Sequence, residues 1–245
     1  MRFSAPPLEG RLRCRYKRFF ADVELPSGTV VTAHCPNTGS LLGCRAEGSR
    51  VWLRDAGRAR RKLRYTWQAI EVDGTWVNVD TSLPNRVVHA AVAAGELAGL
   101  DGGAGVRREV PCGRGSRIDL LLVAAGGSRT YVEVKSTTLV EDGVALFPDA
   151  VTERGRRHLA ALARAVKEGE RAVQLFFVGR ADAEVLRPAA AIDPAYADAL
   201  RRAAAAGVEV RAWCARVEPE ELAIAREIPV ELEPPRRGRG RTAGR

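Results

Sequence analysis

Short runs of alternating apolar and polar residues fill the first third of the chain, and turn-forming residues separate them. Pro26, Ser27 and Gly28 make one such turn, and Asp73 with Gly74 makes another. Alternation with a period of two residues predicts strands that each bury one face. The expected strands cover residues 19–25, 29–35, 49–54, 63–71 and 76–79. Strands this short, at this spacing, predict a small all-β barrel or sandwich.

The pattern changes near Ser82, Leu83 and Pro84, where helical periodicity replaces alternation. We expect helices at residues 86–97, 151–166 and 195–206, and strands at 108–111, 173–178 and 208–214, with a hairpin around Asp119. The second helix is expected to bury the face that carries Val151, Gly155, Leu159, Leu162 and Val166. This order of elements predicts a mixed α/β core after the all-β part.

Two carboxylates and one ammonium lie in the hairpin. Asp119 interrupts the apolar strand at residues 116–123, and Glu133 and Lys135 lie in the strand that follows a turn at residues 125–128. Side chains alternate along a strand, so Glu133 and Lys135 point to the same face. Asp119 shares that face only if the residue directly opposite it is odd-numbered.

Lys135 is one of only four lysines among 39 basic residues, because arginine carries nearly all the positive charge. A guanidinium stays protonated, whereas the pKa of a lysine shifts readily, so a lysine can position or deprotonate a water. A chemical role for Lys135 competes with a simpler interpretation, in which Glu133 and Lys135 form a solvated pair on an exposed strand.

The chemistry of these three residues is that of a divalent-metal site. Two carboxylates at the mouth of a hairpin suit one or two Mg²⁺ (or Mn²⁺) ions, which prefer oxygen ligands. Such an ion lowers the pKa of a bound water and neutralises charge on a phosphodiester under attack. Asp119 and Glu133 are the expected metal ligands, and Lys135 is expected to orient the attacking water.

The length of 245 residues fits one large domain or two modest ones, and a hydrophobic content of 46% is ample for a core. No apolar run approaches the roughly 20 residues that span a bilayer, and no signal-peptide stretch is visible. We therefore expect a cytoplasmic protein without membrane contact. The five cysteines are scattered without a C-x-x-C pair, so neither a disulfide framework nor a zinc site is expected.

The net charge of +9 is unevenly distributed. Residues 1–65 carry +9 and residues 236–245 carry +5, which leaves −5 on residues 66–235. The basic segments on both sides suit binding of a polyanion, and the acidic segment between them suits binding of cations. The alternative is an arginine-rich composition spread over a solvated surface. Residues 236–245 are expected to be a disordered basic tail that adds salt-dependent affinity for nucleic acid.

Basic and aromatic residues interleave in residues 11–20. Arg15, Lys17 and Arg18 are expected to bind phosphates while the neighbouring rings stack on bases. The alternative is a strand with a basic solvent face and an aromatic core face. Asn37 and Thr38 form an expected tight turn whose polar groups suit a phosphate contact.

Three further residues are expected to contact nucleic acid near the carboxylates. Arg154 and His158 are four residues apart, so they lie side by side on a helix. If the start of that helix faces the carboxylates, both side chains suit a phosphate. The alternative pairs Arg154 with an acid and half-buries His158. Arg117, two residues before Asp119, is expected to bind nucleic acid as well.

Five strings in this order resemble the sugar fermentation stimulation protein A family, over about residues 3–232: residues 15–19, 34–39, 116–119, 133–136 and 147–155. The resemblance implies an OB-like nucleic-acid-binding domain at residues 1–82 and a PD-(D/E)XK nuclease-like domain at 83–235. It also implies binding of DNA and a connection with the expression of sugar utilisation genes. Ile118 stands where many members of the nuclease superfamily have proline.

Three functions remain open at this point. The first is a metal-dependent nuclease acting on DNA. The second is a non-catalytic DNA-binding regulator of sugar (maltose) utilisation genes, although no helix-turn-helix is visible because a strand follows the helix at residues 195–206. The third is an RNA-binding or RNA-processing protein, since an OB-like domain binds either nucleic acid.

Overall fold

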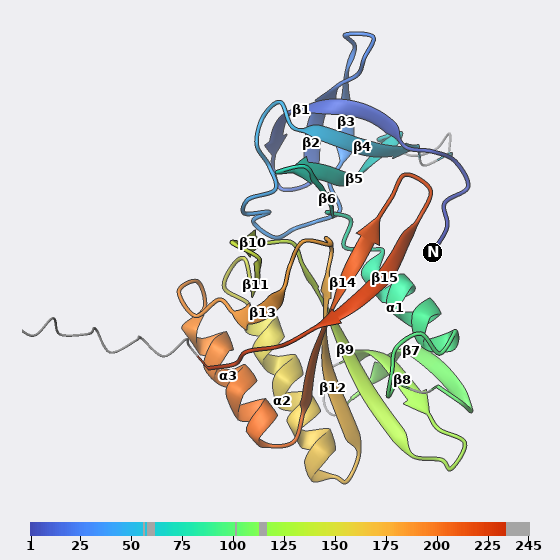
Figure 1. Cartoon of the computed structure of the whole chain (residues 1–245), viewed down its shortest axis with the longest axis vertical. Helices are drawn as coiled ribbons and strands as arrows, with labels where there is room; N and C mark the ends of the chain where they lie inside the picture. Colours follow the sequence, from blue (N-terminus) through green and yellow to red (C-terminus); the bar gives the residue numbers. More distant parts are fainter. Residues whose placement is uncertain (56, 58–61, 101, 113–116, 234–245) are drawn as a thin grey trace, which may run out of the picture.

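The computed structural model describes residues 1–55, 57, 62–100, 102–112 and 117–233, so the predicted tail at 236–245 lies outside the described residues. The first six strands form one sheet in the order β3-β2-β1-β4-β5-β6, at the top of Figure 1. They are β1 (Leu8–Tyr16), β2 (Phe20–Glu24), β3 (Val30–His34), β4 (Arg50–Asp55), β5 (Tyr65–Val72) and β6 (Thr75–Asn78). Since β3 also pairs with β5, strands β1 to β5 close into a barrel. The prediction of a small all-β barrel is confirmed.

Alternation along β1 determines which residues the barrel buries. Gly10 and Leu12 point inward, and the arginines on either side of Leu12 are exposed. An aromatic core face for this segment is wrong, because Tyr16 and Phe19 are 37% and 47% exposed. The reason is that β1 ends at Tyr16, which pairs with Phe20 across a tight turn, so the aromatic residues lie at the end of the hairpin.

The second part of the chain is built on a six-stranded sheet in the order β15-β14-β12-β9-β8-β7. Its strands are β7 (Gly105–Pro111), β8 (Arg117–Val123), β9 (Arg129–Thr137), β12 (Arg171–Val178), β14 (Glu209–Val217) and β15 (Leu222–Ile228). Strands β9, β12 and β14 are parallel, whereas β8 and β15 run antiparallel to their neighbours. The helices are α1 (Pro84–Ala93), α2 (Glu153–Lys167) and α3 (Pro194–Ala205). The predicted mixed α/β fold is confirmed.

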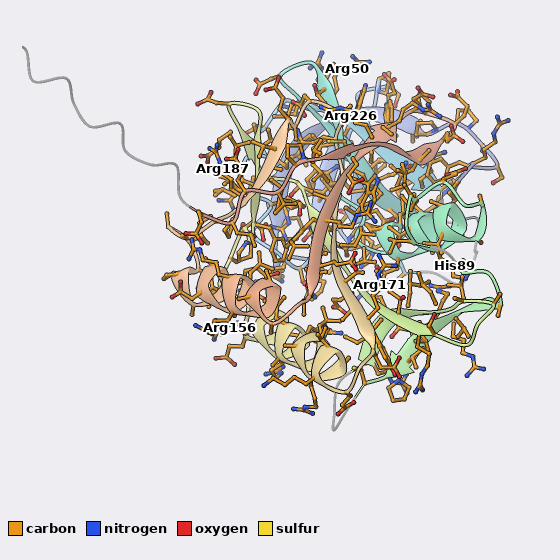
Figure 2. The ribbon with its side chains drawn as sticks, turned by 60° about the horizontal axis from the view of Figure 1, so that its bottom comes forward. Arg50, His89, Arg156, Arg171, Arg187 and Arg226 are labelled. Carbon is orange, nitrogen blue, oxygen red and sulfur yellow. The ribbon has the colours of Figure 1, made fainter. Side chains whose placement is uncertain are left out.

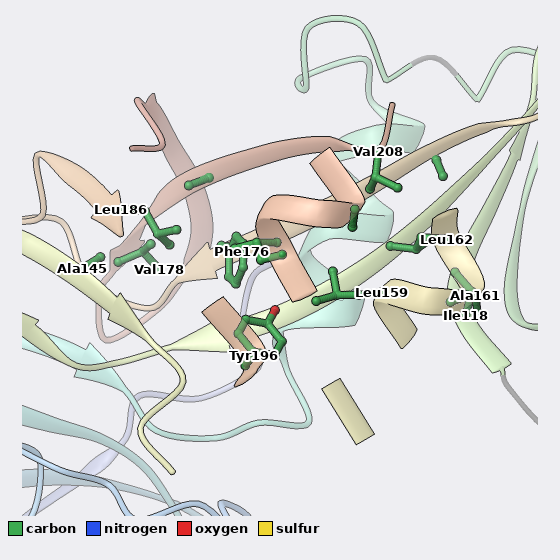
Figure 3. Packing of buried hydrophobic residues seen from close by; sticks show 14 of the residues in the cluster. Ile118, Ala145, Leu159, Ala161, Leu162, Phe176, Val178, Leu186, Tyr196 and Val208 are labelled. Atoms are coloured by element: carbon green, nitrogen blue, oxygen red, sulfur yellow. The ribbon is translucent and has the colours of Figure 1, made fainter. Parts of the chain in front are cut away.

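Helices cover both faces of this sheet: α2 and α3 lie together on one side and α1 lies on the other (Figure 1). The central strand β12 is buried on both faces, which explains its continuous apolar run. Phe176 belongs to the same buried cluster as Leu159 of α2, and its neighbour Phe177 belongs to the cluster that contains Val88 of α1. The sheet therefore separates two cores, and the α2 side is shown in Figure 3.

The start of α2 differs from the prediction. Thr152 caps the helix, because its Oγ1 accepts the backbone N–H of Gly155 at 3.0 Å. Val151 therefore precedes the helix and is 68% exposed, so its expected place on the inner face is wrong. Gly155, Leu159 and Leu162 are buried as predicted. With 15 residues, α2 is the longest described helix, and none in the described part of the chain could cross a bilayer.

β1 was covered only by the alternative interpretation of residues 11–20 as a strand, and four more strands were not predicted at all. Three of them form a small separate sheet: β10 (Val140–Glu141), β11 (Val144–Phe147) and β13 (Val185–Pro188). They are two to four residues long, too short for a period-two pattern to stand out. The fourth is β15, which extends the large sheet beside β14.

The two lobes are joined by polar contacts. Asp149, after β11, accepts the backbone N–H of Leu41 at 3.0 Å and lies 2.9 Å from Ser40 Oγ, both in the loop after β3. The backbone N–H of Asn78 in β6 donates to the carbonyl of Gly179, after β12, at 2.7 Å. The contacts of Asp149 fix the loop between β3 and β4 against the α/β lobe, and the bond of Asn78 fixes the end of β6.

The segment before β1 also crosses between the lobes. The backbone N–H of Phe3 donates to the carbonyl of Glu220, in the turn before β15, at 2.8 Å. The guanidinium of Arg54, in β4, stacks on the Phe3 ring with 3.7 Å between its Cζ and the ring centroid. Arg54 also donates to the carbonyl of Pro219. The first residues of the chain thus help to hold the barrel on the α/β lobe.

Candidate active site

The carboxylates lie where β8 and β9 separate. The ladder between these strands reaches Leu120, opposite Val132, and its register places odd-numbered residues opposite odd-numbered residues. This register places Asp119 on the same face of the sheet as Glu133 and Lys135. One residue beyond this point, Asp119 contacts β9 through its side chain, since its Oδ2 accepts the backbone N–H of Val134 at 2.8 Å.

Asp119 is a carboxylate in an environment that opposes its charge. Its Oδ1 accepts a hydrogen bond of 2.7 Å from Nδ2 of Asn85, at the start of α1. Burial, and next the negative charge of Glu133, nevertheless raise the pKa of Asp119 to about 6. A nearby cation would favour the ionised form.

Glu133 is buried, with only 2% of its surface exposed. Its Oε1 receives two partners: Lys135 Nζ at 2.5 Å and Nδ1 of His158 from α2. Burial alone would raise the pKa of Glu133, but the hydrogen bond with His158 and the charge of Lys135 hold it below its ordinary value. Its Oε2 is buried and has no hydrogen-bond partner among the described residues. The simpler interpretation of a solvated Glu133 and Lys135 pair does not match this burial.

Arg154 and His158 lie side by side on α2. Arg154 Nε donates to Nε2 of His158 at 3.4 Å, and the other ring nitrogen lies against Glu133. His158 is 6% exposed, so it is more deeply buried than the half-buried alternative assumed. Arg154 is exposed and contacts His158 rather than an acid. The imidazole therefore connects a surface guanidinium to the buried carboxylate.

Three residues at the site were not predicted: Asn85, Gln174 and Tyr196. Gln174 Nε2 donates to the backbone carbonyl of Glu133 at 3.1 Å, and its Oε1 is buried without a partner among the described residues. The Tyr196 hydroxyl is likewise buried without a partner in this part of the chain, and burial and the charge of Glu133 raise its pKa. In Figure 3 its oxygen lies among the apolar side chains of the α2 side. Only Gln174 had a sequence signal, as the one polar residue between Val173 and Val178.

The expected nucleic-acid contacts of the barrel fall into two groups. Lys17 and Arg18 are exposed in the turn between β1 and β2. Arg15 instead binds the protein, because its guanidinium donates to the carbonyls of Asn37 at 2.9 Å and Gly39 at 2.8 Å. Arg15 therefore contributes positive charge, but N–H donors of its guanidinium are already bonded to the loop after β3.

The remaining expected contacts lie on both sides of the lobe junction. Asn37 is buried, and its Oδ1 accepts the backbone N–H of Gly39 at 2.8 Å, as expected for a tight turn. Thr38, between them, is exposed. Arg117 is exposed at the first position of β8. Of these, Thr38 and Arg117 have side chains open to a ligand.

The residues present suit a divalent cation. Asp119 and Glu133 supply carboxylate oxygens, and the partnerless Oε2 of Glu133 is a buried acceptor that a cation would satisfy. Within the described residues no three His, Cys, Asp or Glu side chains group as metal ligands. Protein side chains would therefore supply part of the coordination shell and water the rest, which matches the behaviour of Mg²⁺.

Comparison with known proteins finds two family matches on this chain. The family described as "SfsA N-terminal OB domain" matches residues 14–79, and "Sugar fermentation stimulation protein RE domain" matches residues 82–221. The homologue from Citrifermentans bemidjiense is 51% identical over 95% of this chain and all of its own, and that from Maricaulis maris is 50% identical over 95% and 99%. A solved structure of Pyrococcus furiosus SfsA in complex with Ca²⁺ has a TM-score of 0.85 and 29% identity, over 94% of this chain and 98% of that chain.

These matches agree with the observed order of a closed barrel followed by a mixed α/β lobe. They cover the strands that carry Asp119, Glu133 and Lys135. The chain belongs to the sugar fermentation stimulation protein family.

Proposed function

We propose that this protein is a divalent-metal-dependent nuclease that hydrolyses phosphodiesters of DNA. One observation carries the proposal: the half-buried Asp119 and the buried Glu133 lie beside the Lys135 ammonium where β8 and β9 separate. A bound cation would stabilise the ionised form of Asp119, whose pKa is about 6, and the Oε2 of Glu133, which has no hydrogen-bond partner among the described residues. A merely structural ion pair would have no need of the second carboxylate.

Asp119 and Glu133 would hold the metal, which we propose to be Mg²⁺ or Mn²⁺. The Ca²⁺ bound by the Pyrococcus furiosus relative supports a divalent-cation site in this fold. When bound, such an ion lowers the pKa of its water and neutralises charge on the phosphate.

The other residues orient these groups. Lys135 and His158 both contact Oε1 of Glu133, which fixes the carboxylate and leaves Oε2 for a ligand. The ammonium of Lys135 is expected to hold the attacking water and to stabilise negative charge on the phosphate. Arg154 holds the far side of the His158 ring, so both residues act on Glu133 by position rather than by direct contact with the reacting atoms.

The two domains have different roles in this function. Residues 1–82 hold the nucleic acid through the exposed Lys17 and Arg18, and residues 83–235 carry the metal site. Arg117 and Arg154, both exposed near the carboxylates, are expected to contact phosphates next to the cleaved bond.

Incubation of the purified protein with single-stranded, duplex and branched DNA, with Mg²⁺, with Mn²⁺ and with chelator, tests the proposal. Cleavage should require the metal and should fall at least about 100-fold in Asp119→Asn and in Lys135→Met. Both variants should bind DNA at low salt in chelator as the unmodified protein does.

Cleavage that persists in Asp119→Asn would show a contaminating nuclease or another site, and would overturn the assignment. Salt-sensitive binding of DNA without cleavage of any substrate would instead identify a non-catalytic DNA-binding protein. Competition between DNA and RNA of equal length and structure measures which nucleic acid is preferred.

A further inference from the structure

A cavity of about 530 Å³ opens at the junction of the two lobes. The barrel contributes the turn after β1 and the loop after β3, and the α/β lobe contributes residues 147–152, just before α2. We propose that this cavity binds a backbone phosphate, with its attached nucleoside, of a single DNA strand that leads to the carboxylate site. This inference rests on the proposed function and adds a second subsite to it.

The charge of the cavity suits a phosphate. Three guanidinium groups line it, those of Arg15, Arg18 and Arg45, against one carboxylate, Asp149. Asp149 is engaged by Ser40 and the backbone N–H of Leu41, so it anchors the loop between the lobes. The cavity therefore keeps an excess of positive charge, which is what an anionic backbone requires.

Neither Arg18 nor Arg45 takes part in the ion pairs formed among the described residues. Many other arginines are paired with nearby acids, and Figure 2 labels four of them: Arg50, Arg156, Arg171 and Arg187. Arg50 pairs with Glu71 at 3.2 Å, Arg171 with Glu209 at 2.6 Å, and Arg187 with Glu231 at 2.6 Å. Exposed guanidinium groups without a partner, gathered at one cavity, remain available to a ligand.

The backbone of the turn that carries Arg18 points to the same conclusion. Lys17 has φ 48° and Arg18 has φ 62°, the left-handed region where glycine or asparagine is favoured. Arg15 supports this turn by donating to the carbonyl of Arg18 at 3.2 Å. Two long basic side chains thus occupy positions where smaller residues would fold more easily, which fits residues kept for binding.

One wall of the cavity is apolar. It includes Val151, which is 68% exposed directly before α2, and Phe147. An exposed valine beside guanidinium groups suits a ligand that is anionic at one end and apolar at the other. A nucleotide of a single strand has this character, since its sugar and base are free to leave the stack.

The cavity lies close to the end of β9, the strand that carries Glu133 and Lys135. A smaller cavity of about 50 Å³ shares Phe147 and Asp149 with it, and is lined further on by Ser136, the residue after Lys135. In this proposal, a DNA strand held between the lobes runs along the end of β9 toward Lys135. The cavity is placed to hold the substrate on one side of the cleaved bond.

Fluorescence anisotropy with a labelled single-stranded oligonucleotide, in chelator so that no cleavage occurs, tests the inference. We expect Arg18→Gly and Arg18→Gln each to weaken binding about tenfold, and Arg45→Gln to do the same. The thermal unfolding midpoint should be equal or higher in Arg18→Gly, because glycine relieves the backbone, and unchanged in Arg18→Gln. Arg202→Gln, an exposed arginine on α3, is the matched control and should bind within about twofold of the unmodified protein.

Folded Arg18 and Arg45 variants that bind the oligonucleotide as tightly as Arg202→Gln would overturn this inference and leave the proposed nuclease intact. Weakened binding with retained folding supports it whether or not the protein cleaves. An unmodified protein that binds no DNA would overturn both proposals.

Discussion

Asp119 is the residue whose surroundings most oppose its ionised form, and this has a measurable effect on folding. The folded protein keeps the Asp119 proton up to about pH 6, whereas the unfolded chain loses it near pH 3.8. Folding therefore binds a proton in this window, and ionisation of Asp119 reduces stability as the pH rises from about 4 to 6. Without metal, Asp119→Asn should be about 1–2 kcal/mol more stable than the unmodified protein at pH 8.

Urea unfolding in chelator at pH 8 and at pH 3.5 measures this difference. The gain should be largest at pH 8 and should nearly disappear at pH 3.5, where the unmodified side chain is mostly protonated in both states. A variant that is less stable at pH 8 would show that the hydrogen bonds of Asp119 to Val134 and Asn85 outweigh its charge.

The cysteines give a second prediction at this scale. Cys14 is exposed, whereas the other four are buried, and burial raises the pKa of the Cys44 thiol to about 11. Since the thiolate is the reactive form, a thiol reagent should modify one cysteine per folded chain quickly and five after unfolding. Cys14→Ser should remove the fast reaction. Rapid modification of a second thiol in that variant would contradict the described burial.

The sequence identifies some residues of the site and not others, for a physical reason. Asp119, Glu133 and Lys135 can be recognised in the sequence because burying a charged side chain in an apolar strand costs free energy, so charged residues are uncommon there. Asn85 and Tyr196 lie on helices whose composition is ordinary, and they reach the site only through the packing of α1 and α3 on the sheet. Their roles depend on contacts between distant segments, which no local pattern encodes.

At the scale of elements, the start of α2 is where helix propensity and packing disagree. Alanine in place of Gly155 should stabilise an isolated helix by about 1 kcal/mol. Here an added Cβ would lie 2.9 Å from Tyr196 Cε2 on α3, so we expect Gly155→Ala to destabilise the protein by about 1–3 kcal/mol. Chemical denaturation measures the change.

Gly126→Ala is the matched control for this substitution. Gly126 lies in the turn between β8 and β9, and an added Cβ there has no atom within 4 Å. Its free energy of unfolding should change by less than about 0.5 kcal/mol. Stabilisation by Gly155→Ala would show that α2 and α3 separate easily.

Element prediction succeeded where one periodicity extends over several residues. The barrel strands, the three helices and the hairpin of β8 and β9 all have such patterns. Val151 was placed in α2 because it continues the apolar spacing, but the cap at Thr152 decides where the helix begins. Strands β10, β11 and β13 exist through pairing with one another, which their few residues do not reveal.

For the whole molecule, Gly179 tests whether the lobes are held rigidly. Its carbonyl accepts the N–H of Asn78, and an added Cβ would lie 2.9 Å from the Asn78 carbonyl oxygen. Gly179→Ala should therefore force β6 away from the end of β12. We expect the unfolding midpoint to fall by about 2–4 °C per kcal/mol of strain, with faster proteolysis between the lobes. An unchanged midpoint and proteolysis pattern would mean that the junction adapts.

The division into a barrel and an α/β lobe follows from the change of periodicity near Ser82, but the orientation of the lobes does not. That orientation depends on single polar contacts, such as those of Asp149 with Ser40 and Leu41. Each involves ordinary residues in loops, where sequence pattern is weakest.

The contact of Phe3 with Glu220 has a consequence for synthesis. Phe3 precedes its partner Glu220 by more than 200 residues, so it is synthesised well before that partner. The barrel strands emerge before β15 and can pair among themselves, while the segment before β1 stays unpaired until β15 is complete. Such long-range closure is slow, and it exposes Phe3 and the face of Arg54 to other molecules meanwhile. The strand β15, synthesised after the other described strands, thus completes the contacts of the segment before β1.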